Sequence, residues 1–185
     1  MAAPVAQPNE PACAGAVFIA LMEEHHWEAV CDIYQAGIAT GHGTFAAEPP
    51  ATWGAWERDH LGELSLVGVD GSKVVGWAAL APVSGRCVYA GVAEVSVYVA
   101  PEAQGRRVGW QLLSALIGRS EAKNLWTLQA GIFPENQASV ALHRSLGFLE
   151  VGLRRRLGKM TYGPLAGQWR DVLLLERRSS CVGVE

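Results

Sequence analysis

A turn rich in glycine and arginine lies near the middle of the chain, directly before an apolar helical pattern. It reads Gln104-Gly105-Arg106-Arg107-Val108-Gly109 and continues into residues 110–117. Glycines at a helix start let backbone N–H groups approach an anion, and the helix dipole adds about half a positive charge there. The arginines add forked donors suited to phosphate oxygens. The turn therefore indicates a pyrophosphate site, although an ordinary strand-to-helix connection with solvated arginines is the alternative, because a short glycine motif is weak evidence.

A predicted strand leads into this turn and carries one carboxylate among apolar residues. Residues 92–99 alternate so that Glu94, Ser96 and Tyr98 share one face. Pro101 ends the strand because it has no N–H to donate. Glu94 is a candidate general base; the alternative is a strand carboxylate that faces solvent or pairs with an arginine.

A second helix is expected to carry a polar stripe. Residues 134–139 predict a turn that caps this helix, and Gly147 ends it. Asn136, Ser139 and His143 follow one another at i, i+3 and i+7, so they lie along one face. Apolar neighbours can pack on the other side, which lets the polar stripe face a ligand.

The elements that must position these motifs alternate between strand and helix patterns. An Asp70-Gly71 turn predicts a hairpin early in the chain, and two strand-to-helix units follow it. Antiparallel hairpins first and crossovers later indicate an α/β (α+β) protein with a mixed sheet flanked by helices. The expected strands cover residues 17–21, 64–69, 73–82, from near 88 to 99, 125–132 and 167–175, and the expected helices include 27–38 and 53–61.

Composition limits the class of protein. The chain has 185 residues, of which half are hydrophobic and 18% are charged, and this size suits one compact domain. A net charge of −3 argues against a general nucleic-acid binder. We find no 18-residue apolar stretch for a membrane span and no convincing leader. We expect a single domain over residues 15–178, with loose tails at 1–14 and 179–185.

The four cysteines have no spacing typical of a metal site or of a disulfide framework. They are Cys13, Cys31, Cys87 and Cys181, without a Cys-x-x-Cys pair or a plausible histidine partner. Reduced thiols of a cytoplasmic protein are the simplest interpretation.

Together, the turn and the polar helix resemble the acetyl-CoA signature of the GCN5-related N-acetyltransferase (GNAT) superfamily. The family pattern Gln/Arg-x-x-Gly-x-Gly/Ala corresponds to residues 104–109. The pattern Asn-x-x-Ser-x-x-Leu-Tyr/His-x-x-x-Gly-Phe corresponds to residues 136–148. One position departs from the family, because Arg107 stands where glycine is usual. Arginine adopts a positive φ less readily than glycine, so we expect a reshaped loop or a side chain along the phosphates.

Within the superfamily the chain resembles the phosphinothricin and methionine-sulfone acetyltransferase branch, over roughly residues 18–178. The segments that carry this likeness are Gly43-Thr44-Phe45, residues 93–99, His143 and residues 168–172. The resemblance implies a mostly antiparallel, twisted sheet that splays at the cofactor site, and a homodimer.

The resemblance also implies where acetyl-CoA binds. Backbone N–H groups around Val97, Tyr98 and Val99 are expected to face its pantetheine arm, and the Asn136 amide is expected to donate to that arm. The implied cofactor-binding residues are Val97, Tyr98, Val99, Gln104, Gly105, Arg106, Arg107, Val108, Gly109, Trp110, Asn136 and Ser139.

Two residues receive catalytic roles from the resemblance. Glu94 corresponds to a proposed general base, which acts on the substrate ammonium directly or through water. His143 stands where many members place a tyrosine proposed to reprotonate the leaving thiolate. A histidine can serve there as an acid or in a proton relay, or it can be hydrogen-bonded near the cofactor without proton transfer.

The acceptor site is expected around a loop and the strand that carries Glu94. Thr44 and Phe45 match a loop that reaches the substrate, and Val95 and Ser96 lie next to the base. Arg86 is the candidate for a substrate carboxylate, because guanidinium binds carboxylate in a fork; an exposed arginine is the alternative. Arginines 154–156 are expected at a solvated edge or near the nucleotide phosphate.

The sequence therefore predicts an acetyl-CoA-dependent N-acetyltransferase. Its expected acceptor is the α-amine of a small amino-acid-like compound of the phosphinothricin or methionine sulfoximine or sulfone type, and transfer is direct. Acetylation of a protein N-terminus or another small amine is the alternative activity, and an acyl-CoA-binding sensor without activity is the alternative class. No metal, nucleic acid or membrane is expected as a partner.

Overall fold

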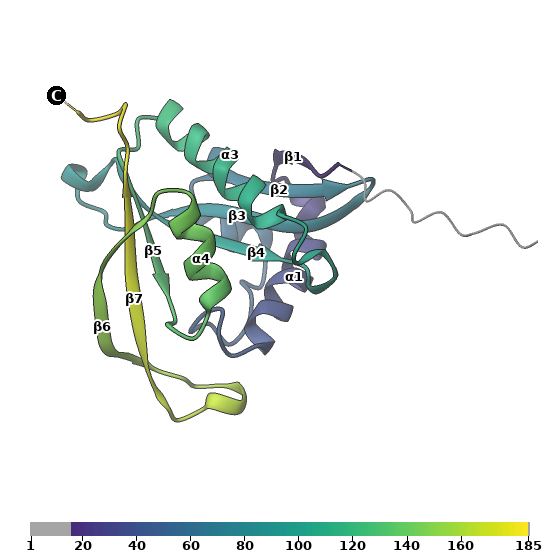
Figure 1. Ribbon diagram of the computed structural model, residues 1–185. Helices are drawn as coiled ribbons and strands as arrows, with labels where there is room; N and C mark the ends of the chain where they lie inside the picture. The colour runs from purple at the N-terminus through teal and green to yellow at the C-terminus, as the bar shows by residue number, and fades with distance from the viewer. Residues whose placement is uncertain (1–15, 185) are drawn as a thin grey trace, which may run out of the picture.

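The computed structural model describes residues 16–184 and is built on one seven-stranded sheet (Figure 1). The strand order is β1-β2-β3-β4-β5-β7-β6, and every neighbouring pair is antiparallel except β4 with β5. This confirms the mixed, mostly antiparallel sheet that the sequence predicted. The strands are β1 (Phe18–Leu21), β2 (Ser65–Asp70), β3 (Lys73–Pro82), β4 (Val92–Val99), β5 (Thr127–Ile132), β6 (Leu149–Lys159) and β7 (Trp169–Arg178).

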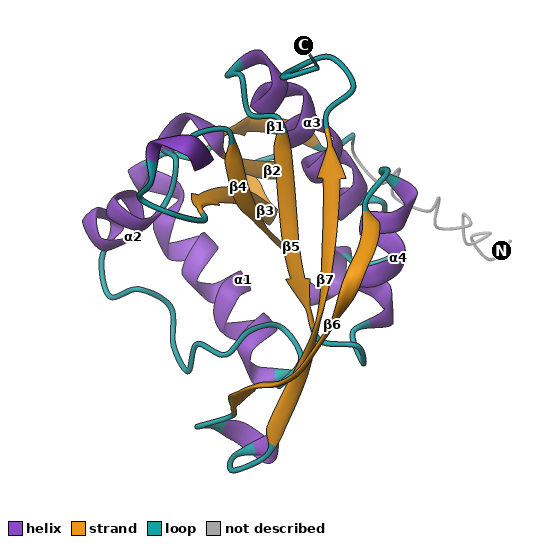
Figure 2. Ribbon diagram, turned by 90° about the vertical axis from the view of Figure 1, so that its left-hand side faces the viewer, coloured by secondary structure: helices purple, strands orange, loops and turns teal. Residues whose placement is uncertain are grey.

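Helices cover the sheet on both faces, but not evenly. They are α1 (Trp27–Ala39), α2 (Trp53–Asp59), α3 (Val108–Ala122) and α4 (Gln137–Ser145). On one face, α1 brings Tyr34 against Trp77 and Tyr98, whose ring centroids lie 5.3 and 4.8 Å away. On the other face, α3 buries Leu112, Leu113 and Leu116 completely, and each such side chain stabilises the fold by about 1.5–3 kcal/mol. Figure 2 shows that no helix crosses the viewer's face of β5, β7 and β6.

The β4–β5 pair separates along its length. Residues 92–94 of β4 pair with residues 127–129 of β5, and the parallel ladder stops there. Beyond Glu94, β4 continues beside β3 alone, while β5 continues beside β7. The edges of the two strands that face each other therefore lack a partner strand, which opens a gap in the middle of the sheet.

Most of the predicted elements are present, with two differences. The strand expected from near residue 88 begins at Val92, because Cys87–Tyr89 forms a turn of 3-10 helix. β6 was not expected, because its pairing with β7 is interrupted twice and its pattern is therefore irregular.

The second predicted tail, residues 179–185, begins with a residue that the fold holds in place. The tail predicted at residues 1–14 lies outside the described residues. At the other end, Ser179 is buried, its N–H donates to the Trp126 carbonyl at 2.8 Å and its hydroxyl donates to Glu121. Across residues 16–184, the structure has no helix with the length and apolar character needed to span a membrane.

Candidate active site

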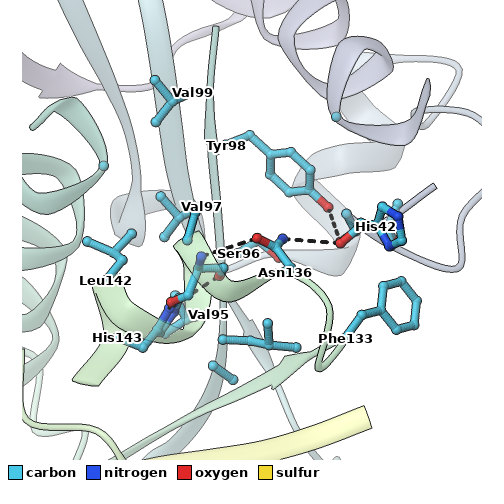
Figure 3. A pocket seen from close by; sticks show the side chains of 18 of the residues that line it. His42, Val95, Ser96, Val97, Tyr98, Val99, Phe133, Asn136, Leu142 and His143 are labelled. Carbon is cyan, nitrogen blue, oxygen red and sulfur yellow. Dashed lines mark hydrogen bonds between the residues drawn. The ribbon is translucent and has the colours of Figure 1, made fainter. Parts of the chain in front are cut away.

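A cleft of about 1000 Å³ lies where β4 and β5 separate. Its walls come from β4, the turn before α3, α4, the loop before residue 46 and the far strands of the sheet. Figure 3 shows β4 side chains on one side of this cleft and Asn136 and His143 of α4 on another. The predicted site residues that line it are Thr44, Phe45, Glu94, Val95, Ser96, Val97, Tyr98, Val99, Gln104, Gly105, Arg107, Gly109, Trp110, Asn136, Ser139 and His143.

The turn before α3 has the conformation expected of an anion site. Gly105 has φ 75°, and Arg107, the residue before the helix, has φ 62° and ψ 15°. Arginine thus adopts the left-handed conformation of the glycine it replaces, at a cost of about 1–2 kcal/mol. Its guanidinium lies 4.9 Å from the centroid of the Trp110 ring. The first N–H groups of α3 have no partner within the helix, so they are available to a ligand.

Two of the predicted cofactor residues direct their side chains away from the cleft. Arg106 donates to Asp70 at 2.7 Å, which ties the turn to the β2–β3 hairpin. Val108 is 1% exposed and packs in the core. The Val108 side chain is therefore not available to a ligand, and the Arg106 guanidinium is held by Asp70.

Asn136 joins α4 to the loop on the opposite side of the cleft. Its Oδ1 accepts the Ser139 N–H at 3.2 Å, which caps the helix, and its Nδ2 donates to the His42 carbonyl at 3.1 Å. Figure 3 shows both hydrogen bonds. Donation from this amide to a pantetheine arm remains a prediction, since one hydrogen of Nδ2 is already engaged.

His143 is buried in α4 with one ring nitrogen engaged. Nδ1 lies 2.8 Å from the Ser139 carbonyl oxygen and must carry the hydrogen in that contact. Nε2 is therefore an acceptor in the neutral ring, and among the described residues it has no partner. Burial lowers the pKa of the imidazole below its usual value of about 6.5. The ring is thus neutral at pH 7 and has no proton on Nε2.

Glu94 is the last β4 residue paired with β5, and its side chain is exposed to the cleft. Its Oε1 would lie 3.4 Å from a Cβ added at Gly131, which in turn would lie 3.3 Å from Val172 Cγ1. Gly131 therefore leaves room for the carboxylate. No arginine or lysine within residues 16–184 forms an ion pair with it.

The loop that carries Thr44 is held by side chains from several distant elements. Four successive carbonyl groups each accept one hydrogen bond from a different side chain, and these bonds fix the loop against α4, β4 and β7. They are Arg170 Nη1 to Gly41 at 2.8 Å, Asn136 Nδ2 to His42 at 3.1 Å, Tyr98 Oη to Gly43 at 3.0 Å, and Tyr162 Oη to Thr44 at 2.7 Å.

Arg170 has the most partners among these donors. It is 4% exposed, and its Nη2 lies 3.0 Å from Glu135 Oε2 and 3.1 Å from His42 Nδ1. Its guanidinium also stacks 4.1 Å from the Phe133 ring centroid. Sequence reasoning did not single it out. The available signal was its position two residues before the apolar Val172 and so on the same face of the strand, where a charged side chain needs partners.

The acceptor residues expected from the sequence divide into two groups. Thr44, Phe45, Val95 and Ser96 line the cleft. Arg86 is exposed in the turn before Cys87 and does not line the cleft, so its role stays a prediction. Arg154, expected at a solvated edge or near a phosphate, is exposed on the edge strand β6 and also lines the cleft.

The whole arrangement suits a long, polar ligand. The unpaired edge of β4 can receive hydrogen bonds along an extended chain, and the α3 turn can receive an anion at its end. No group of three His, Cys, Asp or Glu side chains within residues 16–184 is placed to hold a metal ion.

Comparison with known proteins agrees with this geometry. The model of the acetyltransferase (GNAT) family matches residues 23–148. A phosphinothricin N-acetyltransferase of Streptomyces coelicolor is 31% identical over 161 residues, which cover 83% of this chain and 91% of that protein. An L-methionine sulfoximine/L-methionine sulfone acetyltransferase of Pseudomonas aeruginosa is 35% identical over 128 residues, covering 66% of this chain and 70% of the relative.

Among solved structures, a GNAT superfamily phosphinothricin acetyltransferase from Sinorhizobium meliloti in complex with AcCoA superposes with a TM-score of 0.79. It is 26% identical, and the match covers 91% of each chain. The resemblance predicted from the two motifs is confirmed. The chain belongs to the acetyltransferase (GNAT) family and is an N-acetyltransferase.

Proposed function

We propose that this protein transfers acetyl from acetyl-CoA directly to the α-amine of a small amino-acid-like compound. The observation that carries the proposal is the separation of β4 from β5 at Glu94. The Glu94 carboxylate lies at the point where the unpaired β4 edge begins, so a candidate base and a row of backbone amides line one cleft. The names of the curated relatives support an acceptor of the phosphinothricin or methionine sulfoximine or sulfone type.

The cleft suits acetyl-CoA in two places. Backbone N–H groups of residues 105–110 would bind the pyrophosphate, with Arg107 adding charge. The unpaired edge at residues 97–99 would pair with the amides of the pantetheine arm, much as a further strand would. A residue larger than Gly109 would crowd this path, since a Cβ at that position would lie 3.2 Å from Leu142 Cδ2 and 3.4 Å from Val99 Cγ2.

The residues of this chain would then support direct transfer without an acyl-enzyme: the nitrogen–acetyl bond forms, the C–S bond breaks, and the second nitrogen proton passes to the departing CoA thiolate or to water. Acetyl-CoA supplies an activated thioester carbonyl. Glu94 takes a proton from the acceptor ammonium, directly or through water, which frees the nitrogen lone pair to attack that carbonyl. Backbone N–H groups at residues 97–99 hydrogen-bond to the carbonyl oxygen as negative charge develops on it. Holding both reactants in line in this way supplies much of the rate enhancement.

His143 would assist departure of the thiolate only through Nε2. Because Nδ1 donates to Ser139, a proton relay must bring a proton to Nε2 and then release it. The alternative is a histidine that only accepts a hydrogen bond there. Removal of a relay would lower kcat in a pH-dependent way, whereas loss of an acceptor would lower it equally at all pH values.

The test follows CoA release with a panel of amino acids, N-terminal peptides and polyamines. We expect turnover with amino acids, and a loss of about 10²–10⁴-fold in kcat/KM for Glu94→Gln, with acetyl-CoA affinity unchanged by calorimetry. Glu176→Gln is the matched control, because Gln129 pairs with both residues in the sheet while Glu176 does not line the cleft. Binding of acetyl-CoA without turnover on any amine would favour a sensor.

We further propose that the protein is a cytoplasmic homodimer. Cys31, Cys87 and Cys181 are free thiols, which suits a reducing compartment. Leu149 and Val151 of the edge strand β6 are 75% and 60% exposed, and an exposed apolar edge favours association with a second copy. Analytical ultracentrifugation of Val151→Asp against the parent protein tests this, with a dimer expected only for the parent.

A further inference from the structure

β6 contains an irregularity beside the cleft. Arg154 pairs with Val172 and Gly158 pairs with Arg170, so three β6 residues lie opposite the single residue Asp171. The Asp171 carboxylate accepts the Arg156 N–H at 2.7 Å. Arg156 adopts φ 48°, which is uncommon for a residue other than glycine. Bulges next to active sites redirect side chains, and this bulge lies beside the cleft.

The bulge separates three consecutive arginines. Arg154 and Leu157 line the cleft, whereas Arg155 does not, and the backbone of Arg156 forms the turn. Cross-strand partners share one face of a sheet, so Arg154 lies on the same face as Val172. The contacts at Gly131 place the Glu94 carboxylate and Val172 on that face too. Glu94 and Arg154 therefore belong to one surface that crosses β4, β5, β7 and β6.

The charges in the cleft leave Arg154 without a partner. Among the described residues that line the cleft, Glu135 is paired with Arg170 and Arg107 stacks on Trp110 at the turn before α3. Glu94 and Arg154 are the remaining carboxylate and guanidinium, and neither forms a hydrogen bond or an ion pair with another described residue. The surface between and around them is mainly apolar and includes Phe45, Phe133, Leu157 and Val172.

We propose that Arg154 binds an oxyanion of the acceptor. A guanidinium binds a carboxylate or phosphinate through two parallel hydrogen bonds, while Glu94 receives the ammonium on the same face. The acceptor is therefore an amine that also carries an acidic oxygen group, either its α-carboxylate or the acid at the end of its side chain. This inference rests on the proposed acetylation of amino-acid-like compounds, and names the residue that selects among them.

The experiment compares Arg154→Met with the parent protein on matched acceptors. Phosphinothricin against methionine sulfone tests an acidic side-chain end, and each amino acid against its α-amide tests the α-carboxylate. Hydrogen bonds to charged groups predict a loss of about 10- to 100-fold in kcat/KM. The loss should lie mainly in KM and should disappear for the acceptor that lacks the relevant oxyanion. Arg154→Lys should recover part of the activity, since it keeps the charge without the fork.

Two variants serve as controls. Arg155→Met changes a neighbour outside the cleft and should leave all acceptors unaffected. Arg86→Met tests the competing arginine predicted from the sequence. Thermal unfolding of each variant should match that of the parent, because Arg154 is exposed and has no described partner.

The outcomes separate this inference from the proposed function. If the parent acetylates amino acids but Arg154→Met affects acidic and neutral acceptors alike, or Arg86→Met alone shows the selective loss, the role of Arg154 is overturned while the function stands. If the parent acetylates no amine, the proposed function fails. Calorimetric titration of phosphinothricin into CoA-loaded protein then decides the role of Arg154, and equal Kd values for parent and Arg154→Met would overturn it.

Discussion

The two halves of the cleft are built in different ways. The half predicted to bind the cofactor, called the cofactor half, consists of the β4 edge and the turn before α3, which offer mainly backbone groups from residues 97–110. The acceptor half consists of the loop at residues 41–44, held by side chains 55 to 129 residues away in sequence. A backbone site depends on local conformation, whereas the acceptor loop depends on the whole tertiary structure. Changes in the donors of the loop should therefore affect the acceptor while leaving the cofactor bound.

Replacement of Arg170 should give the largest difference between the acceptor half and the cofactor half. Arg170→Met removes the donors to Gly41 and His42 and leaves Glu135 without its partner. We expect a loss of about 1–3 kcal/mol in unfolding free energy, because a buried donor of hydrogen bonds to the loop is removed while the half-exposed Glu135 stays solvated, and at least a tenfold rise in acceptor KM. Urea unfolding and steady-state kinetics measure the two effects. Tyr162→Phe, which removes one bond, should give a smaller change of the same kind, and an equal rise in the Kd of acetyl-CoA would contradict the division.

Asn136 should be the exception, because it belongs to both halves. Asn136→Ala removes the cap of α4 and the donor to His42. Each of these two hydrogen bonds contributes about 1 kcal/mol to the free energy of unfolding. We expect both the acetyl-CoA Kd and the acceptor KM to rise several-fold, measured by calorimetry and kinetics on one preparation. Asn136→Asp keeps the cap acceptor but not the donor, so it should retain more helix stability. A change confined to one substrate would show that Asn136 does not connect the halves.

Replacement of Arg107, in the cofactor half, should change protein stability and acetyl-CoA affinity in opposite directions. Arg107 adopts a left-handed conformation that glycine adopts without steric strain. Arg107→Gly therefore stabilises the folded state by about 1 kcal/mol, and the greater entropy of glycine in the unfolded chain offsets part of this gain. It also removes one positive charge from the predicted phosphate site. Thermal unfolding should therefore show a small stabilisation in the absence of ligand, while acetyl-CoA binds a few-fold more weakly. Acceptor KM at saturating acetyl-CoA should not change. Tighter binding of acetyl-CoA by the glycine variant would show that Arg107 does not contribute to phosphate binding.

The smallest expected effect concerns His143 and pH. Burial lowers the pKa of His143 in the folded protein relative to the unfolded chain. The unfolded chain therefore binds more protons below about pH 6.5, and stability that is present above this pH falls as the pH falls through the folded pKa. His143→Gln should reduce this acid destabilisation when melting temperatures are compared between pH 5 and 7.5. His26 and His60 also have lowered pKa values, so part of the slope should remain. An unchanged slope would mean that His143 is not buried as a neutral ring.

Much of the fold followed from local patterns. The helix at Trp27–Ala39 matches its apolar periodicity, and the Asp70-Gly71 turn forms the predicted hairpin. β6 was missed because a strand interrupted by bulges at Glu150–Gly152 and Arg154–Gly158 has no regular alternation. Its pairing is decided by β7, which lies beside it only in the folded protein.

The sequence by itself determined the local conformation of the predicted cofactor half, namely the turn before α3 and the capped start of α4. Its motifs are contiguous, and the conformations of a glycine turn and a capped helix depend on neighbouring residues. Only the tertiary structure decided which side chains face the acceptor. It turned Arg154 into the cleft, left Arg86 outside it, and gave Arg170 the Gly41 carbonyl and the His42 ring as partners. The physical reason is that a side chain's direction is set by strand register and bulges, and its partners come from segments 35 to 129 residues away in sequence.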